Sequence, residues 1–233
     1  MISVRNVYKR FGDVRALAGL SFEARDGEIT GLLGSNGAGK TTALRIICGA
    51  LRPDAGSVHI DGVSGTDHPL AAQQKLGAIL DHTGLYARLT AREHLAYFAE
   101  LRGVPETCVG ETLAVLGMES IADRRTAGFS QGQRMKTALG RAMVHGPGNV
   151  VLDEPTNGLD VPSVRALRDT LKRFRDEGRC VVFSSHVMDE VQALCDSVVV
   201  VAAGSVVARG PVAQLCDRSA GESFEDAFVR LTC

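Results

Sequence analysis

The sequence lacks a long apolar run, an excess of one charge sign and a pair of closely spaced cysteines. Its longest apolar stretch covers residues 198–203, whereas a membrane-spanning helix needs about 18 or more residues. The 26 Lys and Arg residues balance 27 Asp and Glu residues, giving a formal net charge of −1. Such a balance predicts no basic surface for bulk DNA or an anionic bilayer. We therefore expect no nucleic-acid partner, and a chain that reaches a membrane only through another protein.

The six cysteines are scattered, and none stands in a C-x-x-C pair. This pattern fits a reducing cytoplasm and excludes a disulfide framework. Hydrophobic residues make up 45% of the 233 residues and charged residues 23%, which is average for a soluble globular protein. Composition therefore indicates one large α/β domain or two small ones, and it names no function.

Short apolar runs and helical periodicities alternate along most of the chain. Strands are expected where apolar runs are bounded by turn residues, at 2–7, 18–24, 29–33, 57–60, 150–152, 180–183 and 198–201. Helices are expected where apolar residues recur at helical spacing, at about 40–47, 91–101, 106–116, 132–144, 162–177 and 188–195. The region from about 69 to 146 thus resembles an inserted helical lobe, and the later strands predict a parallel sheet covered on both faces.

A glycine-rich segment follows the apolar run 29–33 and opens the first helix. It satisfies G-x-x-x-x-G-K-[ST], in which backbone N–H groups and a helix N-terminus form a cradle for phosphate. We expect Lys40 to reach the β- and γ-phosphates and Thr41 to bind Mg²⁺. A glycine turn without a ligand is the alternative, which the flanking strand and helix disfavour. The expected nucleotide contacts are Gly34, Ser35, Asn36, Gly37, Ala38, Gly39, Lys40, Thr41 and Thr42.

Two carboxylates end a second apolar run. Asp153 and Glu154 follow residues 149–152 directly, and ligand groups of open α/β sheets gather at the carboxyl ends of the strands. We expect Asp153 to contact Mg²⁺ and Glu154 to act as a base or to orient water. The alternative is that they only cap the strand end.

One of the six histidines, His186, is expected at the same edge of the sheet as the two carboxylates. His186 follows the run 180–183 through two serines, so it belongs at the same sheet edge, where a ring N–H could hydrogen-bond a γ-phosphate. On position alone, a surface histidine remains an equal alternative.

A further loop makes the pattern specific. The segment 129–134, F-S-Q-G-Q-R, opens a helix and ends 19 residues before Asp153. Together with the preceding motifs it resembles the signature loop of the ATP-binding cassette (ABC) family, and the resemblance extends from Ile2 to Gln214. It implies a P-loop NTPase (RecA-like) core with a mostly parallel sheet, an N-terminal antiparallel β subdomain and an inserted α-helical subdomain.

The resemblance also implies residue roles and boundaries. The core would comprise 1–80 and 145–215, the helical subdomain 85–144 and a C-terminal tail helix 216–233. The catalytic residues would be Glu154, His186 and Lys40, and the metal ligands Thr41, Asp153 and Asp81. Phe11 would stack on adenine, with Tyr8 the weaker choice and turn packing the alternative for Phe11.

In this family the signature loop contacts ATP held by the other subunit. The resemblance therefore implies that Ser130, Gly132 and Gln133 bind the partner's nucleotide, and that Asp160, in the D-loop 158–160, lies near the dimer interface. The unit would be a head-to-tail dimer holding two ATP and Mg²⁺. For Ser130 a helix cap is the alternative, and both roles are compatible.

The sequence departs from the family pattern at two positions. Gln131 replaces a glycine that the family often varies. Asp81 stands where a glutamine usually binds Mg²⁺ and couples to the membrane subunit; its carboxylate is shorter and charged. Asp81 with 83–86, 89–93 and 184–186 resembles the sodium-extrusion (NatA-type) branch of bacterial ABC exporters.

The function implied is the ATPase subunit of a transporter, peripheral on the inner face of the membrane through separate permease subunits. The alternatives are a soluble ABC ATPase of repair, translation or iron–sulfur assembly, and a P-loop kinase or GTPase. A short apolar stripe, Phe224, Ala227, Phe228 and Leu231, could bind a partner, although docking on its own domain is the favoured interpretation.

Overall fold

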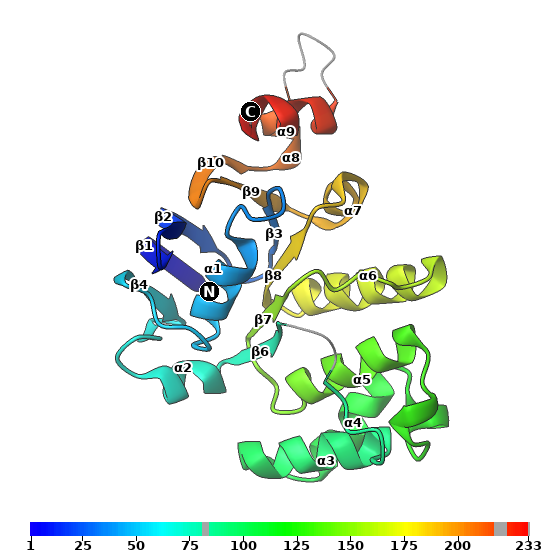
Figure 1. Cartoon of the computed structure of the whole chain (residues 1–233). Helices are drawn as coiled ribbons and strands as arrows, with labels where there is room; N and C mark the ends of the chain where they lie inside the picture. The colour runs from blue at the N-terminus through cyan, green and yellow to red at the C-terminus, as the bar shows by residue number, and fades with distance from the viewer. Residues whose placement is uncertain (81–83, 217–222, 233) are drawn as a thin grey trace.

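The strands of the computed structural model, which describes residues 1–80, 84–216 and 223–232, form two sheets (Figure 1). The first is antiparallel, in the order β2-β1-β4-β5: β1 (Ile2–Phe11), β2 (Val14–Ala24), β4 (Ala55–Ile60) and β5 (Val63–Ser64). The second has the order β10-β9-β3-β8-β7-β6: β3 (Ile29–Leu33), β6 (Leu76–Ile79), β7 (Asn149–Leu152), β8 (Cys180–Ser185), β9 (Ser197–Ala202) and β10 (Ser205–Gly210). Its pairings are parallel except for that of β10 with β9.

Helices cover the sheets and form a separate lobe. They are α1 (Lys40–Ile47), α2 (Pro69–Gln74), α3 (Ala91–Arg102), α4 (Thr107–Val115), α5 (Gln131–Met143), α6 (Val161–Asp176), α7 (Met188–Leu194), α8 (Val212–Leu215) and α9 (Phe224–Thr232). Short 3-10 helices cover Glu119–Ile121 and Thr126–Gly128. Helices α3, α4 and α5 lie together at the opposite end of the molecule from α8 and α9 (Figure 1).

The six-stranded sheet separates two hydrophobic cores. In β8, Val181 and Phe183 belong to the core shared with the helical lobe and α6, whereas Cys180 and Val182 belong to the core shared with α1 and the first sheet. This alternation follows from the two-residue period of a strand. Because both faces are buried, the strand has no polar face, which is why its residues 180–183 are continuously apolar.

The expected α/β fold class is confirmed, including the N-terminal antiparallel sheet and the inserted helices. Three strands were not expected from the sequence. Residues of β6 lie within the region that the sequence indicated as helical, and β5 and β10 were not recognised. A buried run of four residues carries no periodicity of its own, so only its pairing with β7 identifies β6.

The apolar stripe near the C-terminus is buried on its own domain, as favoured. Phe224 in α9 is 4% exposed and Ala227 is fully buried, and the helix packs on β9, α7 and α8. Partner binding through these two side chains is therefore not supported.

Candidate functional site

The phosphate-loop segment lies between β3 and α1, as expected. Gly39 has a φ of 109°, and a Cβ there would lie 2.6 Å from the Ala16 carbonyl oxygen, so this position requires glycine. Lys40 is 6% exposed, and its ammonium donates to the carbonyl oxygens of Gly34 at 2.8 Å and Ser35 at 3.3 Å. The loop therefore holds a buried cation at the N-terminus of a helix, which suits an anion.

A cleft of about 420 Å³ opens beside this loop. It gathers residues from the end of the first hairpin, the phosphate loop, the end of β7 and the loop after β8. They are Val14, Arg15, Ala16, Asn36, Gly37, Gly39, Lys40, Thr41, Thr42, Glu154, Asn157 and His186. The structure thus brings together the phosphate loop, Glu154 and His186, which lie up to 150 residues apart in the chain.

The two carboxylates at the end of β7 are held from the neighbouring strand. Ser184, fully buried in β8, donates its hydroxyl to Asp153 Oδ1 at 2.5 Å and accepts the Glu154 backbone N–H at 2.9 Å. Glu154 has a φ of 46°, a left-handed conformation that is costly for a residue other than glycine. The chain therefore bends sharply here, and Ser184 fixes the bend.

The Glu154 side chain lies between two cationic or ionisable groups. Its Oε2 is 2.8 Å from His186 Nδ1, and its Oε1 is 3.7 Å from Lys40 Nζ. The carboxylate is one-fifth exposed. A carboxylate placed at the mouth of a phosphate cradle and hydrogen-bonded to an imidazole can accept a proton from a water in that cleft.

The signature-loop segment forms a second surface, away from this cleft. Ser130 caps α5: its Oγ accepts the Gln133 N–H at 3.3 Å, and the Gln133 side chain accepts the Ser130 N–H at 3.1 Å. Ser130 is exposed, and among the described residues the cleft lining includes none of 129–134. The capping alternative for Ser130 is therefore confirmed, and its hydroxyl remains accessible.

The start of α6 abuts the signature loop. A Cβ on Gly132 would lie 2.2 Å from Ser163 Oγ, so the two helix N-termini pack with no room for a side chain. Asp160 caps α6 by accepting the Ser163 N–H at 2.9 Å, and the hydrogen bonds from Ser163 hold the pKa of Asp160 below its ordinary value. The signature loop and the D-loop thus form one continuous surface.

Comparison with known proteins identifies the family. The ABC transporter family model matches residues 17–157. The ABC transporter ATP-binding protein NatA of Bacillus subtilis (strain 168) is 38% identical over 238 aligned residues, covering 98% of this chain and 97% of that relative. The chain belongs to the ABC transporter family.

Solved structures agree with this assignment. An ATP-binding subunit of an ABC transporter superposes with a TM-score of 0.89 at 27% identity, covering 99% of both chains. A bacterial ABC transporter cassette solved as a dimer superposes with a TM-score of 0.79 at 25% identity, covering 91% of this chain and 98% of that one. The present ABC protein is accordingly an ATP-binding, ATP-hydrolysing transporter subunit, and neither a soluble repair or translation ATPase nor a kinase or GTPase is supported.

No helix in the described ranges combines the length and the apolar content needed to cross a bilayer.

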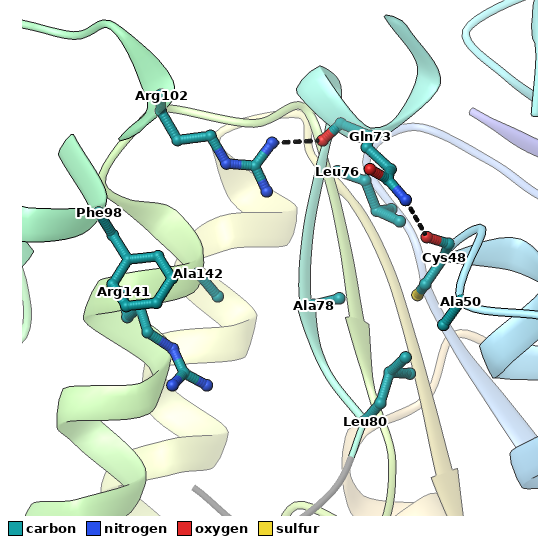
Figure 2. A pocket seen from close by; sticks show the side chains of 10 residues that line it. All are labelled: Cys48, Ala50, Gln73, Leu76, Ala78, Leu80, Phe98, Arg102, Arg141 and Ala142. Carbon is teal, nitrogen blue, oxygen red and sulfur yellow. Dashed lines mark hydrogen bonds between the residues drawn. The ribbon is translucent and has the colours of Figure 1, made fainter. Parts of the chain in front are cut away.

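A groove separates the ATP-binding core of this ABC subunit from its helical lobe (Figure 2). Its volume is about 430 Å³, and it is lined by Cys48, Ala50, Gln73, Leu76, Ala78, Leu80, Phe98, Arg102, Arg141 and Ala142. Arg102 donates to the Gln73 carbonyl oxygen at 2.9 Å, and the Arg141 guanidinium lies 5.1 Å from the Phe98 ring centre. Burial lowers the pKa of Arg141. The two guanidinium groups give the groove a positive rim.

Two oxygen donors at or beside the cleft fit Mg²⁺: Thr41 lines the cleft, and Asp153 directly precedes the lining residue Glu154. Among the described residues, no group of three or more His, Cys, Asp or Glu could hold a metal ion by itself. Thr41 and Asp153 offer a hydroxyl and a carboxylate, the hard oxygen ligands that Mg²⁺ takes when nucleotide phosphates complete its shell. Asp81, the third expected ligand, lies outside the described residues.

The expected adenine platform is not among the residues that line the cleft. Phe11 is 50% exposed at the end of β1, with Lys9 Nζ 5.7 Å from its ring centre. Tyr8 lies over Gly19 of the neighbouring strand. The lining instead contains Val14 and Arg15 from the other arm of the hairpin, so stacking by Phe11 remains a prediction.

The sequence interpretation missed several residues of the site. Arg15, Asn157 and Ser184 carry no motif of their own. For Ser184 a signal existed, because a serine at the carboxyl end of a buried strand, directly beside the strand that ends in Asp153, is placed to hydrogen-bond that carboxylate.

Proposed function

We propose that this chain is the ATPase subunit of an exporter and works as a head-to-tail homodimer with two Mg·ATP at the interface. One observation carries the proposal: the phosphate cleft and the exposed Ser130 hydroxyl lie on separate surfaces of one chain. If both contact the same γ-phosphate, they must come from two copies. The likeness to a cassette solved as a dimer supports this arrangement.

In this proposal the residues of the cleft divide the reaction between them. Lys40 and the loop N–H groups hold the phosphates, and Thr41 and Asp153 hold Mg²⁺, which neutralises phosphate charge when bound. Glu154 takes a proton from water as its oxygen attacks the γ-phosphorus, and the bond to the β–γ bridging oxygen breaks to leave ADP and phosphate. His186 contributes a ring N–H to the γ-phosphate and orients Glu154 through their 2.8 Å contact.

ATP binding would draw two copies together through the second surface. Ser130, Gly132 and Gln133 would meet the partner's γ-phosphate, with the positive end of α5 behind them. Asp160 and its D-loop would line the same interface. Loss of phosphate removes the shared ligand, so hydrolysis would reopen the dimer.

We assign the boundaries of this single ATPase domain as follows. Residues 1–80 and 145–215 form the catalytic core with the β subdomain, 85–144 form the helical subdomain, and 216–233 form the tail. Phe11 would stack on the adenine.

The groove between core and helical lobe would receive the permease. It borders Leu80, directly before Asp81, and its rim carries Arg102 and Arg141. A segment with acidic and apolar residues from a separate transmembrane subunit fits this chemistry. Asp81 would then transmit nucleotide state to the permease and serve Mg²⁺ directly or through water. The NatA-type resemblance favours export of a small substrate such as sodium, with the chain peripheral on the cytoplasmic face of the membrane.

The test is Glu154→Gln, which keeps the shape of the side chain and removes its basicity. We expect ATP binding to remain nearly intact, turnover to stall, and a dimer to accumulate in ATP when measured by light scattering. Hydrolysis at the wild-type rate would contradict the role of Glu154. A monomer that binds ATP without dimerising would contradict the shared interface. Reconstitution in vesicles with a permease encoded by an adjacent reading frame, with sodium flux as the readout, tests the transported substrate.

A further inference from the structure

One carboxylate lies behind the nucleotide cleft, buried, and does not line it. Glu190 in α7 is 9% exposed, and no other Asp or Glu in the described part of the chain is as buried. A buried carboxylate is costly unless its oxygens are hydrogen-bonded. Packing alone would be served better by an apolar residue, so the position calls for another explanation.

The hydrogen-bond partners of Glu190 come from two different segments, the loop after β7 and the last residue of β8. Its Oε2 accepts the Thr156 hydroxyl at 2.6 Å and the Ser185 hydroxyl at 3.4 Å. Thr156 stands two residues after Glu154, and Ser185 directly precedes His186. One carboxylate oxygen therefore connects the segment after the proposed base with the segment that carries the histidine.

No strand pairing can make this connection. The ladder between β7 and β8 ends at the pair Leu152 and Phe183, before either functional side chain is reached. Beyond that pair, Ser184 joins β8 to Asp153 and to the Glu154 backbone. Side-chain hydrogen bonds thus replace the backbone ladder where the two loops diverge.

We propose that Glu190 is a positioning residue for ATP hydrolysis, which holds the 2.8 Å contact between Glu154 and His186 by tying Thr156 to Ser185. The inference rests on the proposed function, because it assumes that Glu154 and His186 act on the nucleotide. Glu190 does not line the cleft, so it acts only through these residues. Weakening the tie lets the two loops separate and misplaces the base relative to the attacking water.

The test uses single-turnover hydrolysis of Mg·ATP by a saturating excess of protein, because at saturation the rate constant does not depend on the folded fraction. Glu190→Ala is expected to lower the rate constant about tenfold or more, the usual effect of losing such a supporting group, with ATP affinity nearly unchanged. Glu190→Gln should stay within about threefold of wild type, since its amide oxygen can accept both hydrogen bonds. Asp189→Asn, at the exposed neighbouring position, is the matched control and should behave as wild type.

A double-mutant cycle with Thr156→Val sharpens the test. Thr156→Val alone should lower the hydrolysis rate constant. Added to Glu190→Ala it should lower the rate constant no further, because the hydrogen bond is already lost. Additive losses would overturn the proposal, and so would a wild-type rate in Glu190→Ala or equal losses in the Ala and Gln variants. If Glu190→Ala does not fold, Thr156→Val decides alone: a slower rate supports the tie, and a wild-type rate refutes it.

Glu154→Gln, measured in parallel, distinguishes a failure of the proposed function from a failure of the role assigned to Glu190. Wild-type hydrolysis in Glu154→Gln would refute the proposed function itself. A stalled Glu154→Gln together with a wild-type rate in Glu190→Ala would refute the present inference alone.

Discussion

The cleft beside the phosphate loop and the surface around the signature loop differ in how many parts of the chain build them. The cleft draws on four chain segments, and its cation Lys40 is buried against the loop that will hold phosphate. The surface around the signature loop has a capped helix end and an exposed Ser130, which does not line that cleft. The cleft gathers its groups from distant parts of the chain, whereas the surface around Ser130 presents a single helix end. This difference fits the proposal that two copies work as a pair.

The largest expected effect comes from disabling each surface separately. Lys40→Ala removes the phosphate cation, and Ser130→Arg blocks the second surface. Each variant alone should lose ATPase activity by about a hundredfold or more, the cost of removing a main electrostatic contact to the transition state. Colorimetric phosphate release measures the loss.

Mixing these two variants tests whether the cleft of one copy works with the signature loop of the other. In a mixed dimer the intact cleft of one copy faces the intact signature loop of the other. When equal amounts of the two variants are mixed, about half of the dimers contain one copy of each. Each such dimer has one intact site of two, so at most about a quarter of the wild-type activity should return. No recovery at any ratio would mean that cleft and signature loop are not shared between copies.

A smaller effect is expected from Gly132→Ala. The new Cβ would lie 2.2 Å from Ser163 Oγ, and such overpacking costs about 1–3 kcal/mol of the free energy of unfolding. Denaturant unfolding should show this loss while ATP affinity stays nearly unchanged, because the clash is remote from the cleft.

Two further variants test the cause. Gly132→Ala with Ser163→Gly should regain stability, since the clashing side chain is gone and the backbone N–H that Asp160 accepts remains. Gly128→Ala is the control, because a Cβ there meets no atom within 4 Å. Equal losses at positions 128 and 132 would rule out the contact as the cause.

A further effect concerns stability at acid pH and His145, which directly follows the helical subdomain. Burial, with a contribution from Arg102, lowers the pKa of His145 from 6.5 to about 4. The unfolded state therefore binds a proton that the folded state refuses, so the free energy of unfolding should fall as pH drops from 6.5 toward 4. The unfolding midpoint should depend less on pH in His145→Gln than in the wild-type protein. An equal pH dependence in both proteins would contradict the role of His145 in the loss of stability.

Local motifs could be predicted from the sequence because their hydrogen bonds join residues only a few positions apart. The phosphate loop needs only glycines, a lysine and the start of a helix, and Ser130 needs only the N–H groups one turn ahead. The run 180–183 could be identified as a strand because both faces of β8 are buried. By contrast, β6 has four residues without a period, and Val14 and Arg15 enter the cleft only because the hairpin folds over the phosphate loop.

Neighbouring residues in the sequence were enough to predict a glycine-rich phosphate loop, two carboxylates at the end of a strand and a serine at the start of a helix. Each depends on neighbours within a few positions, where the covalent chain fixes distance. The tertiary structure decided the relations between distant segments. It placed Ser184 under Asp153, Glu190 between Thr156 and Ser185, and Ser163 against Gly132. These contacts depend on the register of β7 and β8 and on the packing of α5 against α6, which no local pattern encodes.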